Sequence, residues 1–221
     1  DAAMPRIVAV AVCLCALLAA PVSAEDVFDP PWDATLPNQT EQGWECDGTS
    51  PLDIPLPATW GDNPYGWPPE ATFTNMAYEE IDGPDGTPIP TWHAGEGGGS
   101  IEITIKNNPD PNKWKELFWQ VTADGSPTPT GSPPTITTQP PGGTVTDLPA
   151  PYTHHKWPTG TWYTYNGYHK IEPNPEEETI TFEFAYCTNV SEIVIDTVCV
   201  PEPATLSLLG LGAVALIRRR R

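Results

Sequence analysis

Acidic side chains are the most numerous chemistry-bearing residues of the sequence. The 221 residues include 29 Asp and Glu against 10 Lys and Arg, a net charge of −19. Two carboxylates at a suitable spacing are what a glycoside hydrolase uses as general acid and as base or nucleophile. With so many carboxylates a pair carries little information, and the sequence has no nucleophile elbow, HExxH helix or phosphate-binding glycine loop. We therefore expect a protein that is not an enzyme, with a small carboxylate-dependent glycoside hydrolase as the lowest-ranked alternative.

Two acidic stretches and one histidine pair are the candidates for a metal site. Asp82 and Asp85 surround a Gly-Pro turn, and residues 176–178 are all Glu, so both stretches offer the carboxylate oxygens that Ca²⁺ prefers. A tight turn and a solvated strand entry explain the same residues, so we expect no cofactor and keep calcium as an alternative. His154 and His155 are adjacent, and adjacent side chains of an extended chain point to opposite faces, so one site would seldom use both.

Three cysteines lie beyond the N-terminal apolar segment, at positions 46, 187 and 199. Outside the cytoplasm their usual role is a disulfide, and an odd number leaves one over. If Cys187 and Cys199 lie on the two arms of one hairpin, they are too far apart to bond. Cys46 with Cys199, or Cys46 with Cys187, would join the irregular N-terminal region to the last strand. The Cys46–Cys199 disulfide is slightly favoured.

Aromatic side chains are the remaining candidates for a binding surface. The chain has 9 Trp, 7 Tyr and 5 Phe. Exposed Trp and Tyr rings combine a flat apolar face with a polar handle, and sugar-binding surfaces use them for stacking. In a domain with few leucines the same rings can fill the core instead. The candidate sugar-stacking residues lie beside turns and are Trp157, Trp162, Tyr163, Tyr165 and Tyr168.

The elements that position these residues are short strands. With 29 Pro and 18 Gly the chain has little room for long helices. Three isoleucines alternate with polar residues over 101–106, and a second strand over 115–122 follows a Pro-Asp turn, so the two predict a hairpin. Residues 178–186 and 191–200 predict the last hairpin in the same way.

The rest of the chain is richer in turns. Residues 25–90 are dominated by turn sequences, among them Asp29-Pro30-Pro31, Asn63-Pro64-Tyr65-Gly66 and Gly83-Pro84-Asp85-Gly86, and 71–78 is the best strand candidate. Residues 124–151 contain eight prolines, which predicts a long surface loop with at most a brief strand at 135–138. Strand character resumes at 161–165. The fold class that fits is all-β, an antiparallel β-sandwich of jelly-roll-like kind with long Pro-rich loops, flanked by terminal targeting helices. Jelly rolls are common among carbohydrate-binding modules, but a fold alone does not establish that function.

The N-terminal residues have the layout of a secretory signal peptide. Arg6 precedes an apolar run over 7–20, which is followed by small residues and then by acids. The run is too short to span a bilayer comfortably. We expect residues 1–24 to be removed after Ala24, and we interpret the three residues before Met4 as non-native or mis-assigned.

The C-terminus has three parts in a fixed order. Pro201, Glu202 and Pro203 precede an apolar segment over 206–217, and Arg218, Arg219, Arg220 and Arg221 end the chain. The apolar segment is short for a stable membrane helix, and the arginines favour the cytoplasmic face. This arrangement resembles the PEP-CTERM sorting signal of Gram-negative bacteria, the counterpart of sortase signals. The resemblance covers residues 200–221 and implies an exosortase-type processing partner, export, transient anchoring in the inner membrane, and release to the cell surface or extracellular matrix.

The segment between the two signals, residues 25–199, is the expected β-sandwich domain. Its acids are opposed by five lysines and no arginine, so nucleic acid is excluded as a partner. We predict a non-catalytic protein of the cell surface or exopolysaccharide matrix. The alternative is a carbohydrate-binding module that stacks sugars on exposed Trp and Tyr, with calcium assistance.

Overall fold

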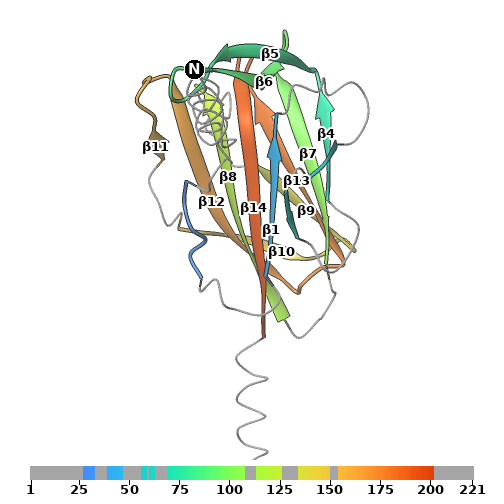
Figure 1. Ribbon diagram of the computed structural model, residues 1–221. Helices are drawn as coiled ribbons and strands as arrows, with labels where there is room; N and C mark the ends of the chain where they lie inside the picture. The colour runs from blue at the N-terminus through green and yellow to red at the C-terminus, as the bar shows by residue number, and fades with distance from the viewer. Residues whose placement is uncertain are drawn as a thin grey trace, which may run out of the picture.

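The computed structural model is all β in the residues that it describes, which are 27–32, 39–46, 56–58, 60–62, 69–107, 113–125, 134–149 and 154–201. Within these ranges, fourteen strands form two antiparallel sheets that pack face to face (Figure 1). The predicted antiparallel β-sandwich is confirmed. The predicted targeting segments lie outside the described residues, except for Val200 and Pro201.

The larger sheet has nine strands and is built around two long ones, β8 (Lys113–Asp124) and β14 (Asn189–Pro201). β14 pairs with β8 along its whole length, with a bulge between Val190 and Glu192. The main path through this sheet is β10-β12-β8-β14-β1-β3, and β11 adds to β12 while β6 links β14 to β5. Its other strands are β1 (Gln39–Glu45), β3 (Trp60–Asp62), β5 (Met76–Asp82), β6 (Pro88–Ala94), β10 (Thr144–Leu148), β11 (His155–Lys156) and β12 (Trp162–Glu172).

The smaller sheet has five strands in the order β2-β4-β7-β13-β9. Its strands are β2 (Leu56–Pro57), β4 (Glu70–Thr74), β7 (Gly99–Lys106), β9 (Thr135–Gln139) and β13 (Glu177–Phe184). β7 and β13 alternate buried apolar with more exposed polar residues, because successive side chains of a strand point to opposite faces. One face of this sheet is therefore a continuous apolar surface.

Neither of the two predicted hairpins forms. β7 lies in the smaller sheet and β8 in the larger, and β13 and β14 are divided in the same way. Alternation identifies which face of a strand is apolar. It does not tell whether two such strands are hydrogen-bonded neighbours in one sheet or face each other across the core. The chain crosses between the sheets at most of its connections, which is jelly-roll-like.

Two other expectations need correction. The single strand expected over 71–78 is divided at Asn75, whose φ of 52° turns the chain from β4 in one sheet to β5 in the other. The Pro-rich segment contains two strands, β9 and β10, rather than one brief strand. Both lie at sheet edges, where prolines near a strand end remove no ladder hydrogen bond.

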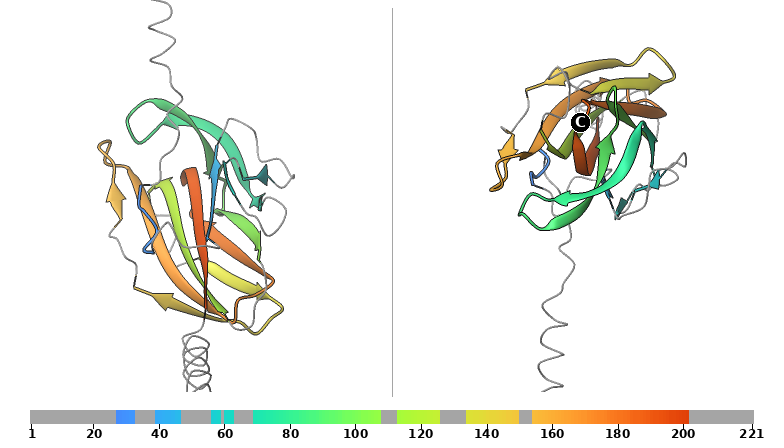
Figure 2. Two further views of the ribbon diagram at one scale, coloured as in Figure 1. Left: turned by 60° about the horizontal axis from the view of Figure 1, so that its bottom comes forward. Right: turned by 90° about the horizontal axis from the view of Figure 1, so that it is seen from above.

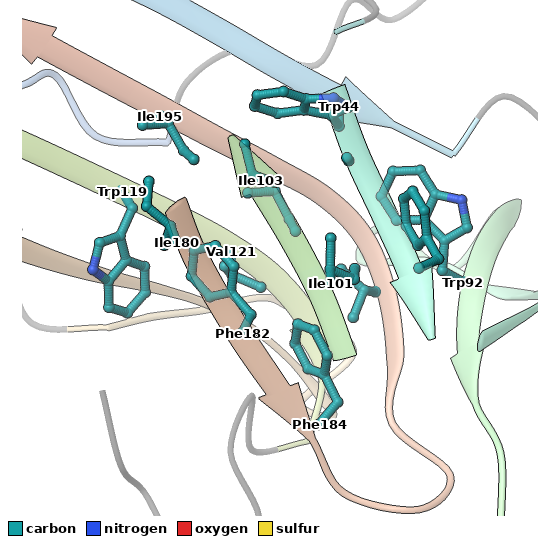
Figure 3. Close-up of a cluster of buried hydrophobic side chains, with 14 of the residues drawn as sticks. Trp44, Trp92, Ile101, Ile103, Trp119, Val121, Ile180, Phe182, Phe184 and Ile195 are labelled. Carbon is teal, nitrogen blue, oxygen red and sulfur yellow. The ribbon is translucent and has the colours of Figure 1, made fainter. Parts of the chain in front are cut away.

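The core lies between the two sheets (Figure 3). Trp119 of the larger sheet meets Phe182 of the smaller sheet edge to face, with ring centroids 5.4 Å apart. Phe73 and Trp92 make a second contact across the sandwich at 4.8 Å. The β5–β6 hairpin lies at one end of the sandwich, and β14 leaves at the other end (Figure 2). Labelled core residues in Figure 3 are Trp44, Trp92, Ile101, Ile103, Trp119, Val121, Ile180, Phe182, Phe184 and Ile195.

Candidate functional site

Three aromatic rings gather where β11 runs beside β12. Tyr163 and Tyr165 are two residues apart and therefore lie on the same face of β12, with ring centroids 5.8 Å apart. The His154 ring lies 5.6 Å from Tyr163 and 5.9 Å from Tyr165. Lys156 places its ammonium 5.7 Å from the centre of the Tyr163 ring. Since His154 is exposed and both tyrosines are half-buried, this cluster, which we call the β12 ring cluster, offers π faces and a cation at the surface.

Hydrogen bonds hold the two tyrosines in place. The Tyr165 hydroxyl donates to the Gly125 carbonyl oxygen at 2.9 Å, and the Tyr163 hydroxyl donates to the Gly160 carbonyl oxygen at 3.5 Å. Burial, and secondarily the neighbouring Tyr163, raises the pKa of the Tyr165 hydroxyl. Tyr165 is therefore a neutral donor at physiological pH, and its ring is fixed in orientation.

The other three predicted sugar-stacking residues do not join this cluster. Trp162 is buried, and its indole donates to the Asp82 carbonyl oxygen at 2.8 Å, so it anchors the β5–β6 hairpin. Trp157 is half-buried and donates to Thr164 Oγ1 at 2.9 Å. Tyr168 lies on the opposite face of β12, where its hydroxyl donates to Glu116. Burial and the Glu116 carboxylate raise the pKa of Tyr168.

The two adjacent histidines also separate. His154 belongs to the β12 ring cluster, whereas His155 packs edge to face on Trp157 at 5.1 Å. The third histidine of this region, His169, is buried and lies between Trp119 and Asp147. Trp119 Nε1 donates to His169 Nε2 at 2.9 Å, and His169 Nδ1 lies 3.0 Å from Asp147 Oδ1. Nε2 is an acceptor here, so Nδ1 carries the proton and the ring is neutral.

Burial lowers the pKa of His169, and Asp147 opposes that shift only in part. Protonating His169 would place the second proton of the ring on Nε2. That N–H would then face the N–H of Trp119, and the hydrogen bond between them would be lost. The contacts from Trp119 through His169 to Asp147, which we call the neutral relay, therefore fix the Trp119 indole against Gly167. A Cβ added at Gly167 would lie 2.4 Å from the ring. These contacts are structural, and they support the strand that carries the β12 ring cluster.

The Cys46–Cys199 disulfide is contradicted by the register of β1 and β14. Cys46 follows β1 and donates its backbone N–H to the Ser191 carbonyl oxygen, eight residues from Cys199 along β14. At about 3.3 Å per residue that separation is roughly 26 Å, while a disulfide requires Cα atoms about 4.4–6.8 Å apart. None of the cysteines in the described residues forms a disulfide, so the alternative Cys46–Cys187 bond is not formed either: Cys46 is buried and Cys187 is exposed in the β13–β14 turn.

The calcium candidates belong to a turn. Asp85 Oδ1 accepts hydrogen bonds from the backbone N–H and the hydroxyl of Thr87, and these bonds lower the pKa of the exposed Asp85 carboxyl. They close the loop between β5 and β6, which Asp82 enters as the last residue of β5. In the parts of the chain that the structure describes, no three His, Cys, Asp or Glu side chains are grouped to hold a metal ion.

One polar cluster was missed by the sequence reasoning. Lys115 and Glu178 are completely buried and form an ion pair, and Asn107 hydrogen-bonds to both. The signal was present, since Lys115 continues the alternation of Leu117 and Trp119, and Glu178 continues that of Ile180. The solvated strand entry expected over 176–178 is wrong for Glu178, which is buried.

A hollow of about 370 Å³ lies near the same end of the sandwich. Four prolines dominate its lining, and Glu176 is its one titratable residue. It therefore offers little chemistry beyond an apolar rim. The lining residues are Pro140, Pro141, Gly142, Gly143, Pro173, Asn174, Pro175 and Glu176.

The C-terminal end of β14 leads directly into the sorting segment. Val200 and Pro201 still pair with Trp114 and Lys113 of β8, so no linker separates the last strand from Glu202. Among the residues that the structure describes, none forms a helix long and apolar enough to cross a membrane. Fold and sequence together define an antiparallel β-sandwich whose central strand continues into an apolar, arginine-terminated tail.

The tail has a counterpart among known protein families. The PEP-CTERM protein-sorting motif matches residues 200–221, as predicted from the Pro-Glu-Pro order. The chain carries a PEP-CTERM signal, which implies an exported protein sorted by an exosortase. The match is confined to this segment, and no curated protein has detectable sequence similarity to the chain.

Proposed function

We propose that this chain is a non-catalytic β-sandwich protein that an exosortase-type system delivers to the cell surface or the exopolysaccharide matrix. The observation that carries the proposal is the sorting motif at residues 200–221, which starts inside the last strand. Cleavage after Pro201 would leave every strand of the sandwich intact. The exported product is then the folded domain itself.

The acidity of the domain is consistent with this destination. Residues 25–201 contain 27 acids and five lysines, and the mutual repulsion of such a surface keeps proteins soluble and separate. The buried ionisable groups His169, Lys115 and Glu178 are hydrogen-bonded within the fold. All three lie within the sandwich domain, outside the sorting motif at residues 200–221.

The experiment follows the protein through the cell. Full-length protein is compared with a Glu202→Ala/Pro203→Ala variant by fractionation into cytoplasm, membranes, cell surface and released matrix. We expect the wild type at the surface and in the matrix, and the variant retained in membranes. Pro201 is left unchanged because it closes β14. Equal distribution of the two proteins would contradict the proposal.

The β12 ring cluster favours a second candidate function, the binding of a polysaccharide. Tyr163, Tyr165 and His154 present neighbouring rings, and Lys156 adds a positive charge to a strongly acidic protein. Two tyrosines separated by 5.8 Å allow one or two sugar rings to stack. Ligands with carboxylate groups would also gain from Lys156.

The test is retention of purified protein on immobilised exopolysaccharide from the producing cells. Tyr163→Ala is expected to reduce retention at least tenfold, while Tyr168→Ala, a tyrosine on the other face of the same strand, retains binding. Thermal melting of each variant excludes unfolding as the cause. Absence of wild-type retention, or equal loss in both variants, would contradict a sugar-binding role for this cluster.

A further inference from the structure

Three polar side chains meet inside the core at the end of the sandwich from which β14 leaves. The Lys115 ammonium donates to one carboxylate oxygen of Glu178 and to the Asn107 carboxamide oxygen. The Asn107 amide nitrogen donates to the other oxygen of Glu178. The carboxylate therefore bridges an amine and a carboxamide that also contact each other.

The ion pair of this cluster is closed off from solvent. Lys115 and Glu178 have no exposed side-chain surface, and Asn107 is half-buried. The strand register places Ile171 and Cys199 beside Lys115, and Ile105 beside Glu178. The Asn107 backbone is fixed by its N–H, which donates to the Glu176 carbonyl oxygen at 2.9 Å.

A buried ion pair is not an efficient way to stabilise a core, because well-packed apolar residues often do as well or better. The composition of this cluster has a more specific consequence. A primary amine, a carboxamide and a carboxylate held together in a largely buried site are the three groups needed to make an amide bond between side chains. Positioning of this kind lowers the barrier by removing the entropy cost of bringing the groups together.

We propose that Lys115 and Asn107 form an intramolecular amide bond, with Glu178 as the catalytic acid and base. Glu178 takes a proton from the ammonium, and the neutral Nζ attacks Asn107 Cγ to form the new C–N bond. Protonated Glu178 stabilises the developing oxyanion. Glu178 passes its proton to Nδ2 as the Cγ–Nδ2 bond breaks, so that Nδ2 leaves as ammonia. The second proton lost by Nζ then converts this ammonia to ammonium. Lys-NH₃⁺ and the carboxamide become a secondary amide and ammonium, Glu178 is regenerated as carboxylate, and no oxidant or energy source is required.

The position of the bond suits a protein that is held by its C-terminus. Asn107 follows β7 of the smaller sheet, and Lys115 lies in β8 of the larger sheet. β8 pairs with β14 up to Pro201, where the sorting segment begins. The amide therefore joins the two sheets covalently at the end of the sandwich nearest the tail. Asn107 and Lys115 are only eight residues apart, so the bond closes a short loop and locks the crossing between the sheets.

Peptide mass spectrometry of the purified full chain tests the bond directly. After denaturation, trypsin cuts at Lys106 and Lys113, between the two partners, but not at an acylated Lys115. We expect one species in which residues 107–113 and 114–156 are joined, lighter than the two peptides together by one ammonia. Separate peptides with an unmodified Lys115 would overturn the proposal. So would ammonia loss confined to peptide 107–113, which is succinimide formation, or loss of water that joins Lys115 to Glu178.

Matched variants assign the roles. Lys115→Arg keeps the charge but is expected to abolish the joined species, and Glu178→Gln keeps the shape but removes the proton relay. Asn107→Asp keeps the cluster intact, and its joined species would be lighter by water instead of ammonia, which tests the chemistry even where Glu178→Gln fails to fold. Lys170→Arg, at a half-buried surface lysine paired with Glu172, serves as the control and retains the bond. A joined species in Glu178→Gln would overturn the role of Glu178.

Discussion

Gly167 is the position where a single added methyl group tests the packing of β12 most sharply. A Cβ built there lies 2.4 Å from Cε2 and Cζ2 of Trp119 and 2.5 Å from Nε1. The indole has little freedom to move away, because Nε1 donates to His169 and the ring edge meets Phe182. Gly167→Ala therefore forces either the ring or the strand to shift.

The cost follows from the contacts that the shift disturbs. Overpacking a core costs about 1–3 kcal/mol, and losing the Trp119–His169 hydrogen bond about 0.5–1.5 kcal/mol. Replacing glycine within a strand returns about 0.5–1 kcal/mol of conformational entropy. We expect Gly167→Ala to lower the free energy of unfolding by about 2 kcal/mol, a fall in the urea midpoint of about 1 M.

Urea unfolding followed by tryptophan fluorescence measures this change. Thr146→Ala, at an exposed position of edge strand β10, is the control and is expected to stay within about 0.5 kcal/mol of the wild type. In a Trp119→Phe background, where the smaller ring leaves room for the methyl group, Gly167→Ala should cost less. A cost below about 0.5 kcal/mol in the wild-type background would refute the reasoning.

Two further predictions concern titratable groups. Because burial lowers the pKa of His169 below its ordinary 6.5, the unfolded chain binds the proton more readily, and stability is lost as pH falls through 6.5. The urea midpoint should therefore decrease more between pH 7.5 and pH 5.5 in the wild type than in His169→Gln. An equal decrease in the two proteins would contradict a neutral His169. For the cysteines, alkylation mapped by peptide mass should modify exposed Cys187 in the folded protein and buried Cys46 and Cys199 only after unfolding, since burial also raises the pKa of Cys199. Isolation of a Cys46–Cys199 disulfide would contradict the strand register.

The strands and their apolar faces could be predicted because alternation is a local property. The isoleucines of 101–106 and the aromatic residues of 180–184 all face the core as expected. The partner of each strand could not be predicted, because two amphipathic strands joined by a turn can pair with each other or cross the sandwich. Both predicted hairpins were wrong for this reason, and the disulfide that depended on the position of Cys46 was wrong with them.

The candidate site shows the same division. Odd- and even-numbered residues of β12 point to opposite faces, which separates Tyr163 and Tyr165 from Trp162 and Tyr168. The sequence predicts this separation for a strand that continues beyond residue 165, as β12 does. Which face would meet the core was not readable, because both faces carry aromatic residues. The Lys115–Glu178 pair was readable as two charges on apolar faces. Its connection to Asn107 depends on how the two sheets meet, which is a tertiary property.

The central claim is that the β-sandwich reaches the outside of the cell through its PEP-CTERM signal. The most direct measurement is the mass of the C-terminal peptide of the protein recovered from the cell surface or matrix. The account predicts a C-terminus near Pro201–Pro203, with the apolar segment and Arg218–Arg221 removed. Surface or matrix protein that still ends at Arg221 would contradict it.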